Sequence, residues 1–185
     1  MTSPRKEQKV RSRMRQMSTG RRGVRAVALA FATVVVAAAC GEDSPTQVQF
    51  QIIEETEFAD SLGVDLPSMT LTSTGVYWKD LVVGTGDAAT WGTTPFVTYK
   101  GWLADGTLFD AGSFDFPMGN NQVVGGFEDG LLNTRAGGTR LMVIPPNRGY
   151  AGQTIYDSRG NVAIPGGSIL VFEVTVDSVY PAPGG

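Results

Sequence analysis

Hydrophobic and polar positions alternate in short runs from residue 76 onward, which is typical of β-strands. Residues 76–83 (VYWKDLVV) are rich in aromatic and β-branched side chains, and in residues 96–103 Val97, Tyr99 and Leu103 fall on one face. Further runs of this kind occupy residues 107–110, 114–118, 139–144 and 169–176. These runs predict about half a dozen strands. The Ala-Asp-Gly turn after residue 103 favours antiparallel pairing, because Asp-Gly accepts the positive φ values of a tight hairpin.

One helix is predicted among these strands, over residues 126–133. Phe127 and Leu131 are four positions apart, so both side chains can face the sheet. The Gly137-Gly138 pair is expected to end this segment. An antiparallel sheet with one helix covering a hydrophobic face is an α+β domain.

Residues 145–167 are predicted to form a long loop rich in Gly, Pro and Asn. A loop of this length inside a compact domain is usually either functional or disordered. It carries Tyr150 and Tyr156, and a core role is less natural for a tyrosine in such a Gly-rich loop, so we favour a functional role for Tyr150.

The first 40 residues have the pattern of an export signal. Nine of the 15 Lys and Arg residues lie in the first 25 positions, and the uncharged run AVALAFATVVVAAA follows at residues 26–39. As a helix these fourteen residues would span about 21 Å, short of the ~30 Å hydrocarbon core of a membrane. A basic region, a short apolar region and small residues at its end predict a cleaved secretory signal.

Cys40, the only cysteine, follows three alanines directly. This resembles a bacterial lipobox, in which the cysteine is lipidated and becomes the mature N-terminus, although Ala37 stands where leucine is usual. We expect a lipoprotein-type signal peptide over residues 1–39, a lipid anchor at Cys40 and a location on the cell envelope facing the periplasm. The alternative is a plain signal peptide cut beside an incidental cysteine.

Residues 40–74 are expected to tether the domain to this anchor. Residues 41–49 (GEDSPTQVQ) are polar and lack a hydrophobic period, as in a flexible spacer. Residues 50–66 could hold one short amphipathic helix, which would pack on the domain, reach a partner or serve as a linker.

The composition excludes several function classes. Histidine is absent, which excludes a Ser-His-Asp or Cys-His nucleophile and a histidine-ligated metal site. A single cysteine excludes an intramolecular disulfide and a CxxC pair. Residues 40–185 carry six basic and 17 acidic side chains, so they are a poor partner for a phosphate backbone. The sequence therefore predicts no metal, no cofactor and no nucleic-acid partner.

Three stretches, in order, resemble FKBP-type peptidyl-prolyl cis-trans isomerases. VTYKGWLADGTLFDAG (residues 97–112) is similar to the family's Tyr-x-Gly-x-Leu-x-Asp-Gly-x-x-Phe-Asp signature. Residues 114–152 resemble the central Phe-x-Phe strand, Gly-aromatic-x-x-Gly helix, Ile-Pro strand and Tyr loop. AIPGGSILVFEVTVDSV (residues 163–179) resembles the last strand. The resemblance implies an antiparallel sheet of about five to six strands wrapped around one short helix, with residues 75–181 as the isomerase domain and residues 182–185 as a tail.

The resemblance also implies an apolar bowl that receives a prolyl ring. Phe127 would be its floor, where the best-studied members carry tryptophan. The implied catalytic residues are Tyr99, Phe109, Asp110, Phe116, Val123, Val124, Phe127, Tyr150 and Phe172. The implied substrate-binding residues are Phe114 at the rim and Ile164 at the far side. The Val124 N–H and the Tyr150 hydroxyl would hold the substrate carbonyls, and Asp110 would be a hydrogen-bonded wall residue.

The reaction itself fits this composition. Rotating an X-Pro bond meets a barrier of about 18–20 kcal/mol, because the planar amide loses its resonance. The twisted amide is less polarised than the planar one, so a dry apolar pocket favours the transition state without a proton donor, metal or nucleophile. We expect proline-containing segments of exported proteins as substrates, a folding-helper role and a monomer; by resemblance, macrolides are expected inhibitors.

Several alternatives stay open. From pattern alone, Phe116 and Phe172 are core residues in most proteins, and Asp110 could simply cap a turn. At the level of function, the competitors are a catalytically weak chaperone or partner-binding module with the same fold, and a structural or adhesive envelope domain. A hydrolase is disfavoured because Glu128 and Asp129 are adjacent on a helix and point apart.

Overall fold

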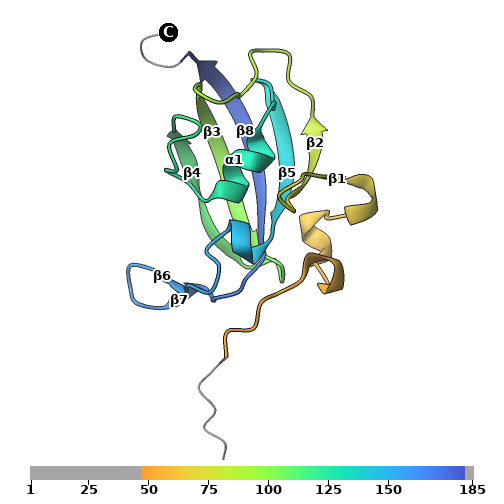
Figure 1. The fold of residues 1–185 in the computed structure, drawn as a ribbon, viewed down its shortest axis with the longest axis vertical. Helices are drawn as coiled ribbons and strands as arrows, with labels where there is room; N and C mark the ends of the chain where they lie inside the picture. Colours follow the sequence, from red (N-terminus) through yellow and green to blue (C-terminus); the bar gives the residue numbers. More distant parts are fainter. Residues whose placement is uncertain (1–46, 182–185) are drawn as a thin grey trace, which may run out of the picture. The chain divides into compact units, whose positions relative to one another are not determined.

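The computed structural model describes residues 47–181, whose centre is a six-stranded antiparallel sheet with the order β1-β2-β5-β8-β3-β4 (Figure 1). The strands are β1 (Thr70–Leu71), β2 (Tyr77–Val82), β3 (Thr94–Leu103), β4 (Leu108–Asp115), β5 (Gly138–Ile144) and β8 (Leu170–Tyr180). The α-helix α1 (Gly125–Leu131) packs on one face. The predicted α+β architecture, five to six antiparallel strands around one short helix, is confirmed.

Side-chain alternation along the central strands gives the sheet two buried faces. In β8, Leu170, Phe172, Val174 and Val176 all lie in the core between the sheet and α1, as their shared face predicts. Val171 points the other way, into a second core on the outer face. A strand buried on both faces reads as a nearly continuous apolar run, which is the pattern of ILVFEVTV.

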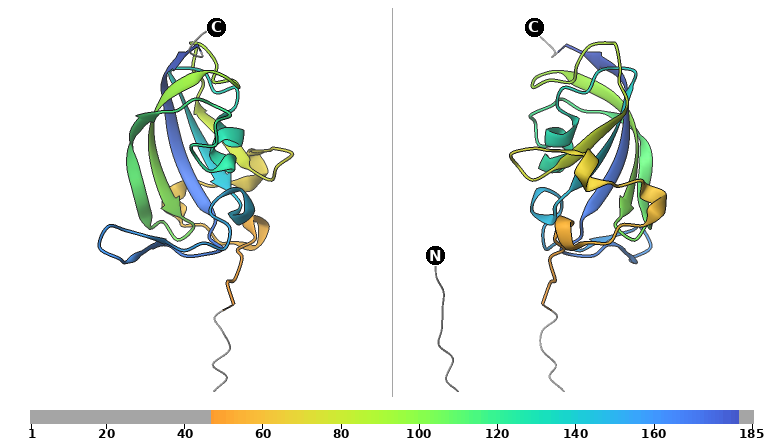
Figure 2. Two further views of the ribbon diagram at one scale, coloured as in Figure 1. Left: turned by 60° about the vertical axis from the view of Figure 1, so that its left-hand side comes forward. Right: turned by 90° about the vertical axis from the view of Figure 1, so that its right-hand side faces the viewer.

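The outer core is covered by residues 53–69, which precede the sheet in sequence. In place of one amphipathic helix, this segment forms three short 3₁₀ helices: η1 (Ile53–Glu55), η2 (Asp60–Leu62) and η3 (Leu66–Ser68). Gly63, with φ +63°, and a proline inside η3 break the segment into these turns. Ile53 and Leu62 are buried beneath the strands, and part of the segment lies on the side of the sheet opposite α1 (Figure 2, right).

The segment predicted as a long loop has a small structure of its own. It contains η4 (Pro146–Arg148) and a two-stranded hairpin, β6 (Ile155–Tyr156) paired with β7 (Val162–Ile164).

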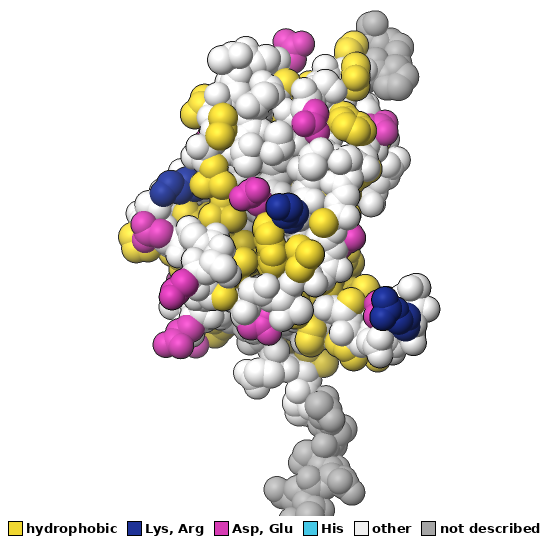
Figure 3. All heavy atoms as spheres, turned by 180° about the vertical axis from the view of Figure 1, so that it is seen from behind, with side chains coloured by type: hydrophobic (Ala, Val, Ile, Leu, Met, Phe, Trp, Pro, Cys, Tyr) yellow, Lys and Arg dark blue, Asp and Glu magenta, His cyan; other side chains and the backbone are white. Residues whose placement is uncertain are grey.

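Acidic side chains are scattered over the surface seen from behind (Figure 3). Within residues 47–181, no helix is long and apolar enough to cross a membrane. The predicted signal peptide, Cys40 and the tail 182–185 lie outside the described residues.

Helix α1 is short and has little intrinsic preference for helix. Three of its seven residues are glycine, and its N-cap residue Val124 makes no side-chain capping bond. A Cβ on Gly126 would overlap Ile144 of the sheet, so this glycine permits the close approach of helix and strand. The helix ends at Leu131, before the predicted Gly137-Gly138 stop, because Asn133 takes the left-handed conformation that ends helices, with φ +65°.

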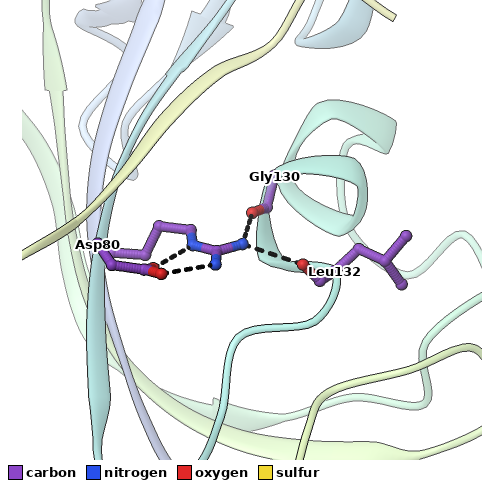
Figure 4. Close-up of polar contacts among 4 residues, drawn as sticks. Asp80, Gly130 and Leu132 are labelled. Atoms are coloured by element: carbon purple, nitrogen blue, oxygen red, sulfur yellow. Dashed lines mark hydrogen bonds and ion pairs between the residues drawn. The ribbon is translucent and has the colours of Figure 1, made fainter. Parts of the chain in front are cut away.

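A buried arginine, Arg140 on β5, fixes the C-terminal end of this helix (Figure 4). Its Nη1 donates to the backbone oxygens of Gly130 and Leu132, at 2.9 and 3.0 Å. Its Nε and Nη2 donate to the carboxylate of Asp80 on β2, at 2.6 and 3.2 Å, and its guanidinium lies over the ring of Trp78 at 3.8 Å. The last carbonyls of a helix lack internal donors, so Arg140 satisfies them and ties α1 to two strands.

Replacing this arginine is expected to destabilise the domain strongly. Arg140 is only 3% exposed, so Arg140→Ala leaves Asp80 and two helix carbonyls without their donors and should lower the free energy of unfolding by about 3 kcal/mol. Urea denaturation followed by circular dichroism measures this. The control Arg159→Ala, in the exposed tip between β6 and β7, should stay within about 0.5 kcal/mol of wild type. Equal stability of the two variants would contradict this role.

Candidate active site

A cavity of about 160 Å³ opens between α1, the strands β3, β4 and β8, and the loop that follows η4. Its lining residues are Tyr99, Phe109, Asp110, Phe114, Gln122, Val123, Val124, Phe127, Tyr150 and Phe172. An apolar cavity of ~150 Å³ is large enough to hold benzene, so this one accommodates a five-membered pyrrolidine ring. Larger hollows lie along residues 47–54, away from this aromatic cluster.

Phe127 forms the floor of the cavity and is 3% exposed. Its ring meets the ring of Phe172 edge-on, with centroids 5.2 Å apart and an interplanar angle of 88°, and lies 6.4 Å from the ring of Tyr99 at 86°. Phe109 contacts the other side of Phe172 at 5.5 Å and 88°. Edge-to-face contacts of this kind stabilise aromatic clusters beyond area burial and fix the ring orientations. The walls are therefore rigid as well as apolar.

Gly101 on β3 lets two of these rings lie directly over the strand. A Cβ at this buried position would be 2.6 Å from Cζ of Phe109 and 2.7 Å from Cε1 of Phe172. No side chain larger than hydrogen fits unless both rings move. The close packing of these two rings at the cavity wall thus explains why the Tyr-x-Gly signature has glycine at this position.

Polar groups at the rim are arranged around Asp110. The Tyr99 hydroxyl donates to Oδ2 of Asp110 at 2.6 Å, and the N–H of Ala111 donates to Oδ1 at 2.9 Å. Burial and this hydrogen bond raise the pKa of Tyr99 to about 12. Burial, followed by the negative charge of Asp110, also raises the pKa of Tyr150. Both hydroxyls therefore stay protonated at neutral pH, and Asp110 is an acceptor held by two donors.

The N–H of Val124 and the hydroxyl of Tyr150 are hydrogen-bond donors at the cavity that have no partner within residues 47–181. The N–H of Val124 precedes the first turn of α1, and the hydroxyl of Tyr150 projects from the loop after η4; neither donates to another group of the described chain. These are the two donors that the family resemblance implies for the substrate carbonyls. Their assignment to that role stays a prediction.

The structure brings together nine of the eleven residues predicted for the bowl and its rim; the exceptions are Phe116 and Ile164. Phe116 is 1% exposed and packs behind the lining, with its centroid 5.4 Å from Phe114 and 5.8 Å from Phe127. Ile164 ends β7 and is buried in the same core. The lining also includes Gln122, which carried no sequence signal beyond its place before Val123. No metal-binding group of three carboxylates or thiols exists in the described part of the chain.

Comparisons with known proteins agree with this geometry. A sequence model described as FKBP-type peptidyl-prolyl cis-trans isomerase matches residues 86–177. The chain is 36% identical over 99 residues to the peptidyl-prolyl cis-trans isomerase FKBP15-2 of Arabidopsis thaliana, covering 51% of this chain and 58% of that protein. It is 29% identical over 136 residues to the photosynthetic NDH subunit of lumenal location 4 from the same plant, covering 68% and 63%.

Among solved structures, FkpA from Escherichia coli superposes with a TM-score of 0.55 at 32% identity, covering 67% of this chain and 56% of that one. The chain spans about three fifths of the length of the two curated Arabidopsis relatives that it matches.

Enlarging Gly101 is expected to damage the cavity while the domain stays folded. In Gly101→Ala the new methyl group would push the rings of Phe109 and Phe172 apart, which costs about 1–3 kcal/mol as overpacking. Near-ultraviolet circular dichroism should show altered aromatic packing with an unchanged far-ultraviolet spectrum. As a control, Lys100→Ala shortens an exposed side chain next to Gly101 on the same strand, so it should leave the aromatic signal unchanged. An identical aromatic signal in both variants would refute the packing role of Gly101.

Proposed function

Because residues 86–177 form an FKBP-type peptidyl-prolyl cis-trans isomerase domain, we propose that this protein isomerises X-Pro bonds of exported polypeptides and assists their folding. The observation that carries the proposal is the small aromatic cavity with the unpartnered N–H of Val124 and hydroxyl of Tyr150 at its edge. The proposed substrates are extended segments with one proline that enters the cavity.

The mechanism follows from the environment of the prolyl amide. The ring enters over Phe127 and between the walls formed by Phe109 and Phe172, and it displaces water from these apolar rings. The planar amide carries more charge separation than the twisted amide, so loss of water raises the ground state relative to the transition state. The N–H of Val124 and the hydroxyl of Tyr150 hold the flanking carbonyls while the C–N bond rotates. No covalent step is needed.

We further propose that the protein works at the bacterial cell envelope, facing the periplasm and anchored by lipid at Cys40. Support comes from the basic and apolar N-terminal pattern and from the position of the only cysteine directly after it. A lipid anchor of several acyl chains binds a membrane firmly, at about 0.8 kcal/mol per buried CH₂ group. Proline-containing proteins in transit through the envelope are then the polypeptides within reach.

A second candidate function is a binding module whose bowl holds proline-containing segments without efficient turnover. Two observations favour it: Phe127 occupies the floor position at which the best-studied isomerases carry tryptophan, and one relative with 29% identity is named as a subunit of a photosynthetic complex. Phenylalanine keeps the apolar ring but lacks the indole N–H. The two candidates differ in turnover, so one assay separates them.

An isomerisation assay on X-Pro peptides by NMR exchange is expected to show turnover that depends on the cavity. Tyr150→Phe removes one donor to the substrate and should lower kcat/KM by about two- to tenfold, the worth of one hydrogen bond. Phe127→Trp should hold or raise it. The matched control is Tyr156→Phe, which removes the same hydroxyl from an exposed strand outside the cavity and should change nothing. If neither the folded wild type nor Phe127→Trp shows turnover, the result would favour the binding module.

The anchor is tested separately from catalysis. Full-length protein expressed in a bacterium with a radiolabelled fatty acid should incorporate the label and fractionate with membranes. Cys40→Ser should lose both properties while the purified protein keeps its isomerase activity, because Cys40 lies outside the catalytic domain. Labelled, membrane-bound Cys40→Ser protein would disprove attachment at this residue.

A further inference from the structure

Residues 48–51, here called the strap, lie against two loops at one end of the domain. The strap precedes η1 and is outside the family match. It joins the domain at the end where η4 and the β6–β7 hairpin lie (Figure 1). A Cβ on Gly152 would be in van der Waals contact with Phe50 and Val48, and a Cβ on Gly167 would overlap the backbone oxygen of Gln49. The strap is therefore packed directly on the turn at residues 166–167 and on the loop that carries Tyr150.

Gln51 makes the specific contacts of the strap. Its backbone N–H donates to the oxygen of Gly167 at 2.9 Å, and its side-chain Oε1 accepts from the N–H of Ile169 at 2.7 Å. Ile169 is fully buried just before β8, so this N–H would otherwise lack a partner. Gln51 thus binds two polar groups of the turn that leads into β8, the oxygen of Gly167 and the N–H of Ile169.

The turn at residues 166–167 is in turn hydrogen-bonded to the loop that carries Tyr150. The N–H of Gly167 donates to the oxygen of Ala151 at 2.7 Å, and the N–H of Ala151 donates to the oxygen of Pro146 at 2.7 Å. Ala151 has φ +52°, a left-handed conformation that costs a non-glycine residue of order 1 kcal/mol or more and persists only when its surroundings enforce it. The residue before it, Tyr150, lines the cavity.

Glycines let these three backbones stack closely. A Cβ on Gly166 would overlap the backbone oxygen of Gly152, and Gly167 has φ +82°. The stack therefore runs without intervening side chains from the strap, through residues 166–167, to residues 151–152. A displacement of the strap is passed on through backbone contacts rather than absorbed by flexible side chains.

We propose that Gln51 is a positioning residue for catalysis: by holding Gly167 and Ile169 it fixes the strained peptide at Ala151 and, through it, the Tyr150 hydroxyl at the cavity. This inference rests on the proposed isomerase function. It assigns to the segment before the catalytic domain a role in the chemistry.

The test uses the full chain and a double-mutant cycle in the X-Pro assay. Gln51→Ala should lower kcat/KM about two- to tenfold, the effect of one lost hydrogen bond, whereas Gln51→Glu keeps an acceptor for Ile169 and should retain activity. The matched control is Gln49→Ala, which removes the same side chain two positions away where it makes no hydrogen bond with residues 47–181. In a Tyr150→Phe background Gln51→Ala should have no further effect, because the hydroxyl that it positions is gone.

Two results would overturn the inference while leaving the isomerase function intact. The first is a Gln51→Ala variant as active as Gln49→Ala. The second is that Gln51→Ala lowers kcat/KM as much in the Tyr150→Phe background as in the wild type. An inactive wild type would instead refute the proposed function. NMR provides a readout independent of turnover: Gln51→Ala should accelerate amide exchange at Ile169 and shift the ring signals of Tyr150, and Gln49→Ala should do neither. Unchanged Tyr150 signals in Gln51→Ala would refute the positioning role whatever the activity.

Discussion

The site depends on where a two-turn helix is held against the sheet. Helix α1 brings the floor of the cavity, Phe127, and the adjacent N–H of Val124, yet its glycine-rich sequence favours helix only weakly. Tertiary contacts supply what propensity does not. Arg140 binds the carbonyls at its C-terminal end, and the half-buried Asp129 pairs with Arg148 of η4. The same glycines that weaken the helix bring it close enough to the strands for the rings to enclose a small apolar space.

This arrangement suits a reaction that needs shape and dryness more than reactive groups. The chain contains no histidine, and the cavity offers two tyrosine hydroxyls and one carboxylate, of which Asp110 is already engaged by Tyr99. Because burial raises the pKa of Tyr150, its hydroxyl stays protonated across the neutral range and can donate a hydrogen bond to a substrate without transferring its proton. Rotation about an amide bond requires no more than that.

Local patterns in the sequence were enough to predict the strands and most of the residues that line the cavity. Alternation along β8 correctly placed Phe172 among the inward residues, and the family signature identified nine lining residues. Phe116 has the same alternation as Phe114, but it follows the end of β4 at Asp115 and is buried in the core, so its ring lies behind the wall. Contacts between residues far apart in the sequence could not be predicted from local patterns. Arg140 is 60 positions from Asp80, and the segment expected to be a tether covers the outer face of the sheet.

The central claim is that a prolyl ring binds over Phe127 and that its neighbouring carbonyl is held by the N–H of Val124. The most direct measurement is a two-dimensional amide NMR titration of the protein with a short X-Pro peptide, with exchange spectroscopy on the peptide. The largest shifts are expected at the amide of Val124 and along α1, together with exchange peaks between the cis and trans forms. Shifts confined to the strap or the outer face, with the amide of Val124 unmoved, would contradict it.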